Sequence, residues 1–153
     1  MSIKQAIFQL NGEDYGLDIT DVNIIEKDIS LIEIKNAPDN MKGKIDLRGK
    51  EIPVYNLRRK FGLEDKEPDL MTRFLIITIK GIDFALEVDH VSGIKDIDET
   101  HIYKVPSIIE SNNTSYIKNI ANIGEGLILI LDSSLLIDQK ELKAMKEILK
   151  KKA

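Results

Sequence analysis

Apolar and polar residues alternate over much of this chain, a pattern that predicts short β-strands with one buried face. The clearest stretch is 43–62, with the sequence GKIDLRGKEIPVYNLRRKFG. Ile45 and Leu47 alternate there with charged residues, and Gly49 gives the backbone freedom that a tight turn with Lys50 needs. An apolar run around a proline follows, and because proline lacks an amide hydrogen we predict an edge strand there. The stretch therefore predicts a hairpin followed by a short helix.

The second half of the chain repeats the pattern of the first half. Turn and strand positions recur 69 residues apart, since Gly12, Tyr15, Leu17, Ile19 and Val22 match Gly81, Phe84, Leu86, Val88 and Val91. Later positions recur 76 residues apart, since Ile52, Val54 and Asn56 match Ile128, Ile130 and Asp132. The polar insertion at 110–115 accommodates the difference. A two-fold repeat of short strands with turns between them predicts an all-β fold of two similar small barrels.

The repeat also suggests where the barrels begin and end. We place the first barrel at about residues 12–70 and the second at about 71–137. The strand at 5–11 can pack with either barrel, and the alternating stretch 28–35 is predicted to be a further strand. Of the 153 residues 26 are isoleucine, a β-branched residue that suits a pleated, half-buried surface.

The residues after 137 predict a C-terminal helix at 138–151. Asp138 followed by Glu141 resembles a capping box, and apolar side chains then recur at helical spacing. This apolar stripe consists of Leu142, Met145 and Ile148 or Leu149. Because the stripe is narrow, we predict that the helix packs one face on a barrel.

Arg48 directly precedes the turn glycine of the central hairpin. One interpretation is an exposed turn arginine, or one that pairs with Asp46 or Glu51, because long charged side chains are usually solvated. The other is an arginine whose angle is fixed by its hairpin, so that it presents a rigid fork of donors to a partner. The pattern alone leaves both open.

Composition narrows the classes of function. The net charge is −4 and most lysines are interleaved with acidic residues, which argues against a nucleic-acid-binding surface. The absence of cysteine excludes disulfides, thiolate zinc sites and cysteine nucleophiles. No apolar run approaches the ~20 residues of a membrane span, and the N-terminus enters a strand-like run without a signal sequence. We therefore expect a cytoplasmic protein without direct membrane insertion.

No catalytic group stands out in the sequence. His90 lies beside Asp89, but neighbouring residues of a strand point to opposite faces, so the carboxylate is poorly placed to orient the imidazole. His101 follows Glu99 and Thr100 in a predicted loop, and no third ligand or nucleophile lies near it. Gly124 and Gly126 fit a hairpin better than a phosphate loop, because the later glycine and helix of such a loop are missing. We expect no enzyme, no metal site and no cofactor, and instead a binding role.

The stretch 43–58 resembles the motif of the CheW family. A glycine, an aliphatic residue, a Leu-Arg-Gly core, an apolar pair around proline and a Leu-Arg pair follow in the family's order. The resemblance continues on both sides, in Phe8-Gln9-Leu10, Tyr15-Gly16-Leu17-Asp18-Ile19, Val22, Pro38, Gly81, Leu86, Val88-Asp89, Val91 and 128–132. It thus covers nearly the whole chain.

This resemblance implies two tandem SH3-like five-stranded barrels packed side by side, with short helices and a C-terminal helix. It also implies a non-catalytic adaptor of bacterial chemotaxis, recruited to membrane receptor arrays. Such an adaptor joins the cytoplasmic tip of methyl-accepting chemoreceptors to the regulatory domain of the histidine kinase CheA. The family's receptor-docking positions match Val22, Gly43 and Arg48, and its kinase-binding strand matches the region of Ile19 and Ile24.

The sequence departs from the family pattern at three positions. Ile24 stands where the family commonly has glutamate, Asp46 stands for its asparagine, and Ala85 stands for a second-half glycine. Asp46 can therefore pair with Arg48, and an ionic contact with the kinase at Ile24 is in doubt. Two alternatives stay open: a scaffold of a non-flagellar kinase system, such as one for twitching motility, and a small β-barrel ligand-binding protein.

Overall fold

The computed structural model describes residues 1–153 apart from 28, 36–39, 106–114, 125 and 151–153. Two features discussed above lie wholly or mostly outside these described residues: Pro38 and the polar insertion at 110–115. No helix in the described part of the chain is long and apolar enough to cross a membrane.

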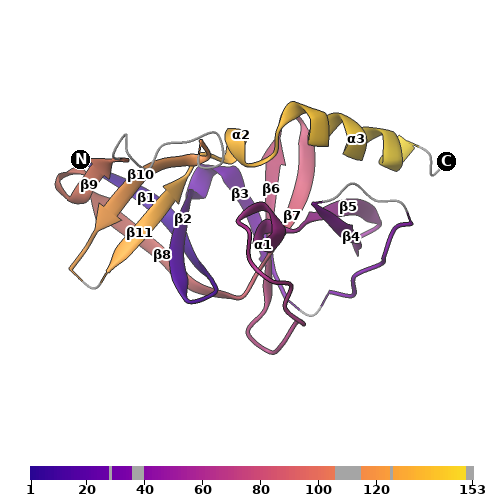
Figure 1. The fold of residues 1–153 in the computed structure, drawn as a ribbon, viewed down its shortest axis with the longest axis horizontal. Coiled ribbons are helices and arrows are strands. Elements are labelled where there is room, and N and C mark those ends of the chain that lie inside the picture. The colour runs from indigo at the N-terminus through magenta and orange to yellow at the C-terminus, as the bar shows by residue number, and fades with distance from the viewer. Residues whose placement is uncertain (28, 36–39, 106–114, 125, 151–153) are drawn as a thin grey trace.

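The chain forms two sheets, which Figure 1 shows at the left and right of the molecule. The six-stranded sheet has the order β8 (His90–Asp98), β1 (Ser2–Leu10), β2 (Glu13–Asp18), β11 (Leu127–Leu131), β10 (Ile117–Asn122) and β9 (Ile102–Lys104). The five-stranded sheet has the order β3 (Val22–Glu26), β6 (Arg73–Ile79), β7 (Ile82–Val88), β5 (Lys50–Tyr55) and β4 (Met41–Leu47). The helices are η1 (Ile19–Asp21), α1 (Leu57–Lys60), η2 (Glu99–His101), α2 (Ser133–Leu136) and α3 (Gln139–Lys150).

The sheets do not divide at residue 70, where the repeat suggested a boundary. Strands β1 and β2 join β8 to β11, while β6 and β7 join β3 to β5. Two parallel pairings cause this exchange, because β2 pairs with β11 and β5 pairs with β7. Alternation of residues predicts a hairpin from local sequence, but the sheet that a hairpin joins depends on such distant pairings. The six strands of one sheet also differ from the five predicted for each barrel.

Three hairpins close through the same kind of turn. Each has a residue other than glycine followed by glycine, both at positive φ: Asn11 (53°) with Gly12 (81°), Arg48 (54°) with Gly49 (86°), and Lys80 (51°) with Gly81 (78°). Positive φ at both central positions is the type I′ turn that matches the twist of paired strands. The central turn is therefore Arg48–Gly49, one residue earlier than the Gly49–Lys50 turn predicted from sequence.

Strands β1 and β6 bury side chains on both of their faces. Along β6, Phe74 and Ile76 belong to a small hydrophobic cluster inside the five-stranded sheet, whereas Leu75 and Ile77 belong to a large core that both sheets share. Strand β1 does the same, because Ile7 lies in a cluster inside the six-stranded sheet and neighbouring side chains lie in the shared core. The shared core therefore joins the two sheets into one body.

The C-terminal helix packs on this shared core. Its capping box is present, since the Glu141 amide donates to Asp138 Oδ1 at 2.7 Å and the Asp138 amide donates to Glu141 Oε1 at 3.2 Å. Leu142 and Met145 of the predicted stripe are buried in the core, while the side chains of 148 and 149 lie outside the described ones. Figure 1 shows α3 above the five-stranded sheet.

The stretch 28–35 was predicted to be a strand and is not one. Its described residues form only an isolated bridge, in which Ile32 and Lys44 exchange backbone hydrogen bonds of 2.8 Å. The segment lies along β4, and its partly buried residues Ile29 and Leu31 pack on the cluster inside the five-stranded sheet. Period-two alternation therefore reports a half-buried segment here without a continuous strand.

Candidate protein-binding surfaces

Two of the five predicted binding residues, Val22 and Ile24, lie in strand β3, and Ile19 lies in the turn before it. Strand β3 forms an edge of the five-stranded sheet. The turn before it is fixed by Asp18, whose Oδ1 accepts from the Thr20 amide at 2.9 Å and the Thr20 hydroxyl at 2.6 Å. Ile19 lies in that turn and is half-buried. Strand β3 pairs with β6 alone, so its other edge has no strand partner among the described residues.

The side chains of β3 alternate between the interior and solvent. Val22 is half-buried against the shared core, and Ile24 packs on the cluster inside the five-stranded sheet. Ile25, which follows Ile24 along the strand, is 39 % exposed. An aliphatic residue in place of the family's glutamate at position 24 therefore adds to a core, and Ile25 is the apolar group that the strand offers to a partner. Ile25 was not among the predicted binding residues, although alternation from Ile24 assigns it to the outer face.

Gly43 lies in β4, at the other edge of the same sheet. A Cβ atom at this position would come within 2.4 Å of the carbonyl oxygen of Ile32 and 3.2 Å of a methyl carbon of Leu31. The close backbone approach that this glycine permits is thus made by the chain's own segment 29–35. Gly43 is buried beneath that segment.

Arg48 lies in the turn between β4 and β5, in the left-handed region of backbone conformation. Its side chain is 78 % exposed, and its Nη2 atom is 4.0 Å from a carboxylate oxygen of Glu26. Asp46, which the sequence suggested as its partner, accepts instead from the Gly49 amide at 2.9 Å. An ion pair this exposed contributes ~0–1 kcal/mol, so it leaves the guanidinium available to a partner.

The contact between Arg48 and Glu26 brings two of the predicted sites together. Glu26 ends β3, so the arginine turn lies beside the end of the strand that carries Val22, Ile24 and Ile25. Gly43 lies on the covered edge and adds no exposed side chain to this surface. We call the surface formed by Val22, Ile25, Glu26 and Arg48 the β3 edge surface.

A mostly buried ionic contact connects the two sheets. Arg58 in α1 donates through Nε and Nη2 to Asp89, at 3.0 Å for Nε, and its Nη1 donates to the Glu64 carbonyl at 2.8 Å. The Asn11 amide, in the turn between β1 and β2, also donates to Asp89 at 2.8 Å. Burial raises the pKa of Asp89, but the bonds from Arg58 and Asn11 outweigh it and hold that pKa below its usual value. Asp89 is thus a structural carboxylate between the sheets.

Glu141 anchors α3 to the five-stranded sheet. Its Oε2 accepts from the Tyr55 hydroxyl and the Asn40 amide, both at 2.8 Å, and its Oε1 lies 3.5 Å from Lys60 Nζ. Tyr55 is fully buried, and burial together with this bond to Glu141 raises the pKa of its hydroxyl. In the described part of the chain no group of three or more His, Asp or Glu side chains could hold a metal ion.

Comparison with known proteins places this architecture. Residues 5–141 match the family model described as the CheW-like domain. The chain is 28 % identical over 144 residues to a chemotaxis protein CheW of Klebsiella aerogenes, covering 94 % of this chain and 87 % of the relative. It is 27 % identical over 137 residues to the chemotaxis protein CheW of Bacillus subtilis, covering 90 % and 88 %.

A solved structure gives the same result for the fold. The scaffolding protein TtCheW from Thermoanaerobacter tengcongensis superposes with a TM-score of 0.82 at 34 % identity, covering 92 % of this chain and 96 % of that one. The match confirms the prediction of an all-β fold made of two SH3-like barrels. The two sheets are called the six-stranded and the five-stranded barrel below.

Proposed function

We propose that this chain, which belongs to the CheW-like domain family, couples methyl-accepting chemoreceptors to a CheA-type histidine kinase. Members of the family are non-catalytic scaffold proteins of chemotaxis, and the chain is one of them. Its proposed partners are the cytoplasmic tip of the receptors on one side and the regulatory domain of the kinase on the other. The protein would then work in the cytoplasm, at receptor arrays on the membrane.

The observation that carries the proposal is the position of Arg48. A type I′ turn holds it at positive φ and its guanidinium is mostly exposed. It lies beside the end of β3, whose outer edge has no strand partner among the described residues. The turn fixes the direction in which the Arg48 side chain leaves the backbone, and its planar guanidinium offers a fork of donors to a partner.

The receptor contact is proposed at Val22 and Arg48. Val22 is half-buried and lies at the rim of the shared core, so a helical receptor tip can cover its remaining apolar surface. Gly43, the third residue of the predicted site, supports this contact indirectly. It allows segment 29–35 to lie against β4, and that segment completes the barrel that carries the arginine turn.

The kinase contact is proposed at Ile19 and Ile24 and includes Ile25. Ile24 is turned to the barrel interior, so it supports the strand, while Ile25 presents the exposed apolar side chain. Binding at an unpaired strand edge uses backbone hydrogen bonds for affinity and alternate side chains for specificity. With an isoleucine at position 24 in place of the family's charge, the apolar contact of this strand comes from Ile25.

The test compares two equivalent turns of this molecule. Arg48 and Lys80 both precede a turn glycine, and their φ angles are 54° and 51°. We expect Arg48→Ala to abolish sedimentation of a CheA-type kinase with a receptor cytoplasmic fragment, along with kinase activation, while Lys80→Ala behaves as wild type. Loss of cation charge and change of turn residue are the same in both variants, so a difference reports the position.

Either of two results would contradict the proposal. If both variants sediment the kinase normally, Arg48 makes no contact with the receptor. If the wild-type protein binds neither partner, the coupling function is wrong, and the kinase and receptors of a non-flagellar system become the partners to test. Thermal unfolding of both variants is measured in parallel, since a variant that unfolds cannot report on contacts.

A further inference from the structure

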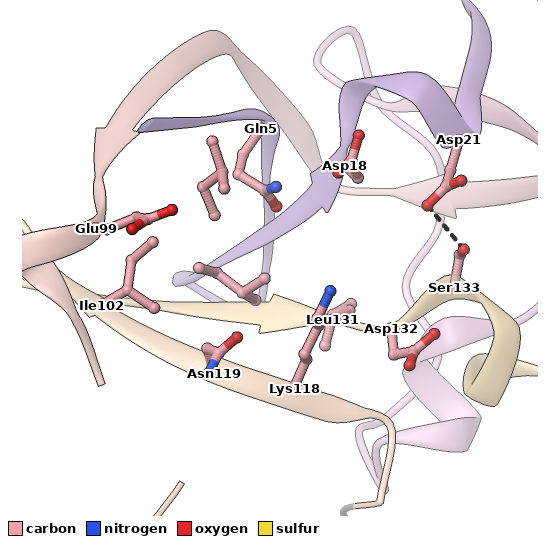
Figure 2. Close-up of a pocket in the computed structure, with 12 residues that line it drawn as sticks. Gln5, Asp18, Asp21, Glu99, Ile102, Lys118, Asn119, Leu131, Asp132 and Ser133 are labelled. Atoms are coloured by element: carbon pink, nitrogen blue, oxygen red, sulfur yellow. Dashed lines mark hydrogen bonds between the residues drawn. The ribbon is translucent and has the colours of Figure 1, made fainter. Parts of the chain in front are cut away.

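A pocket opens at the mouth of the six-stranded barrel, and its lining includes Asp21, the residue before Val22 of the β3 edge surface. It has a volume of about 340 Å³, which lies within the size range of small-ligand sites. Apolar side chains of the barrel interior, Ile3, Ile102 and Ile130, form part of its lining. Figure 2 shows its polar lining, contributed by β1, β2, η1, η2, β10 and the start of α2.

Gln5 reaches this pocket from the barrel interior. It lies in β1 between Ile3 and Ile7, and alternate residues of a strand share one face, so all three point inward. The side chain is only 2 % exposed, yet its Oε1 atom accepts no hydrogen bond in the described structure. A buried acceptor without a donor is costly, and such groups in native proteins are normally satisfied. Gln5 therefore leaves a buried acceptor at the base of the pocket, next to Gly16, without a donor from the described chain.

The rim of the pocket is acidic. Asp18, Asp21, Glu99 and Asp132 line it with one cation, Lys118, so their formal charges sum to −3. Asp18 lies directly opposite Gln5 in the β1–β2 pairing, and opposed residues share a face of the sheet. The Thr20 hydroxyl and amide hold the pKa of Asp18 below its usual value, so this carboxylate is charged at neutral pH.

One oxygen of Asp18 remains available. Both bonds from Thr20 go to Oδ1, and Oδ2 accepts none from the described residues. The pocket thus places an unused carboxylate oxygen and an unused amide oxygen near the aliphatic side chains of its lining. A positively charged donor on an apolar stem satisfies all three features at once.

The five-stranded barrel shows how the equivalent place is filled. At the 69-residue spacing, Gln5 corresponds to Phe74 and Asp18 to Glu87, and Phe74 and Glu87 are likewise paired directly across two strands. Phe74 fills the interior of its barrel, and Glu87 binds the ammonium of Lys42 at 2.5 Å. The carboxylate equivalent to Asp18 therefore already holds an alkylammonium group, supplied by the chain itself.

The corresponding lysine of the six-stranded barrel does not do this. At the 76-residue spacing Lys42 corresponds to Lys118, which is exposed and forms no ion pair within the described part of the chain. The smaller, polar Gln5 in place of phenylalanine leaves room. Lys118 lines the same pocket and its charge helps to lower the pKa of Asp18, but the two form no ion pair in the described part of the chain. We propose that the mouth of the six-stranded barrel binds an alkylammonium group, which donates to Gln5 Oε1 and Asp18 Oδ2 with its stem against Ile3 and Ile102.

The test follows the isoleucine methyl groups of the full-length protein, labelled with carbon-13, during titration at constant ionic strength. Butylammonium and cadaverine are expected to shift the methyl signals of Ile3 and Ile102 but not that of Ile52 in the other barrel. The uncharged n-butanol is expected to leave all three in place. Equal shifts with n-butanol and butylammonium would show an apolar crevice only and would overturn the proposal, as would the absence of any amine-induced shift.

Charge variants test the assigned contacts. Asp18→Asn is expected to weaken butylammonium binding at least about tenfold, because a charge-assisted bond is lost. The control Glu67→Gln removes the same charge from an exposed position outside the pocket and is expected to leave binding unchanged. Lys118→Gln is expected to tighten binding about threefold by removing a like charge from the rim. If amines bind this variant and not wild type, the pocket belongs to Lys118 and the proposal fails.

Gln5→Leu adds a readout that does not depend on charge. Leucine removes the unpaired acceptor and extends an aliphatic interior, so we expect a melting temperature equal to or above that of wild type together with loss of amine binding. Full retention of binding would overturn the contact with Gln5. A titration with acetyl-Gly-Lys-Gly-amide then separates two sources of the ligand: tighter binding of the peptide indicates a partner's lysine side chain, and tighter binding of cadaverine indicates a free amine.

Discussion

The two barrels are built from equivalent strands and turns, but they fill their interiors differently. In the five-stranded barrel Phe74 occupies the interior, and Lys42 neutralises the carboxylate beside it. In the six-stranded barrel Gln5 occupies the equivalent position, and a pocket with an acidic rim opens there. One barrel of the repeat thus has a filled hydrophobic interior, and the other has a polar pocket at the equivalent place. The sealed barrel also carries the β3 edge surface, so a rigid interior supports the surface proposed to bind partners.

The largest expected effect tests whether the interiors really differ in this way. Phe74→Ala should destabilise the protein by ~3–5 kcal/mol, because it removes a buried aromatic side chain and leaves a cavity. Truncation at the equivalent position, Gln5→Ala, should cost less than ~1 kcal/mol, because that side chain borders an open pocket and carries an unpaired acceptor. Urea denaturation measures both. Similar losses in the two variants would show that the barrels are filled alike.

The comparison also assumes that the two barrels stay fixed relative to one another, and Arg58 is the residue to test this. The side chains of Arg58 and Asp89 are 12 % and 19 % exposed, so Arg58→Ala leaves a mostly buried carboxylate without its cation. We expect a loss of ~3 kcal/mol in the free energy of unfolding. Arg59→Ala is the matched control on the same helix, because Arg59 and Asp65 form an exposed ion pair worth ~0–1 kcal/mol. An equal effect of both substitutions would show that the Arg58–Asp89 ion pair stabilises the fold no more than the exposed pair does.

The ion pair between Arg58 and Asp89 should also make the stability of the fold depend on pH. The folded-state pKa of Asp89 lies below its unfolded value, so its contribution is present above the unfolded pKa and is lost as pH falls through the folded one. Wild-type stability should therefore decline below about pH 4, the ordinary range of an aspartate. In Arg58→Ala this decline should be shallower, because the pKa of Asp89 is no longer held down. Denaturation curves at several acidic pH values distinguish the two slopes.

The local elements of this fold could be predicted from sequence, whereas the pairing of strands that lie far apart in the chain could not. Alternation and turn glycines located the hairpins at Gly12, Gly49 and Gly81, and the capping box at Asp138 located the last helix. The exchange of strands between the halves was missed, because parallel pairs such as β2 with β11 leave no local pattern. Which barrel a hairpin completes is decided by the shared core.

The binding residues show the same limit. The motif singled out Gly43 and Arg48, but it could not show that one is covered by the chain itself while the other is exposed. Arg48 at positive φ was also missed, since a glycine beside it seemed to satisfy the turn alone. Gln5 gave no signal in isolation. Its meaning depends on alignment with Phe74, which the repeat permits, and on a burial that only the structure reveals.

The smallest expected effect concerns how the five-stranded barrel is closed. Segment 29–35 lies over Gly43, whereas the equivalent position of the other barrel at the 76-residue spacing is Asn119, which lines the open pocket. Gly43→Ala should cost ~1–3 kcal/mol, because its methyl group collides with the Ile32 carbonyl and the segment must move. Amide exchange should become faster at Ile32 and Lys44, whose mutual bonds hold the segment.

This last substitution separates a direct role of Gly43 in binding from a structural one. If the glycine acts only by seating segment 29–35, loss of kinase sedimentation in Gly43→Ala should follow the faster exchange and should be partly reversed by an osmolyte such as trimethylamine oxide, which favours burial. The matched variant Asn119→Ala, at the equivalent position of the other barrel, should keep both exchange rates and sedimentation. If Gly43→Ala abolishes sedimentation while exchange at Ile32 stays slow, a partner touches Gly43 itself. In that case segment 29–35 must move aside during binding, and the five-stranded barrel is not sealed on that edge.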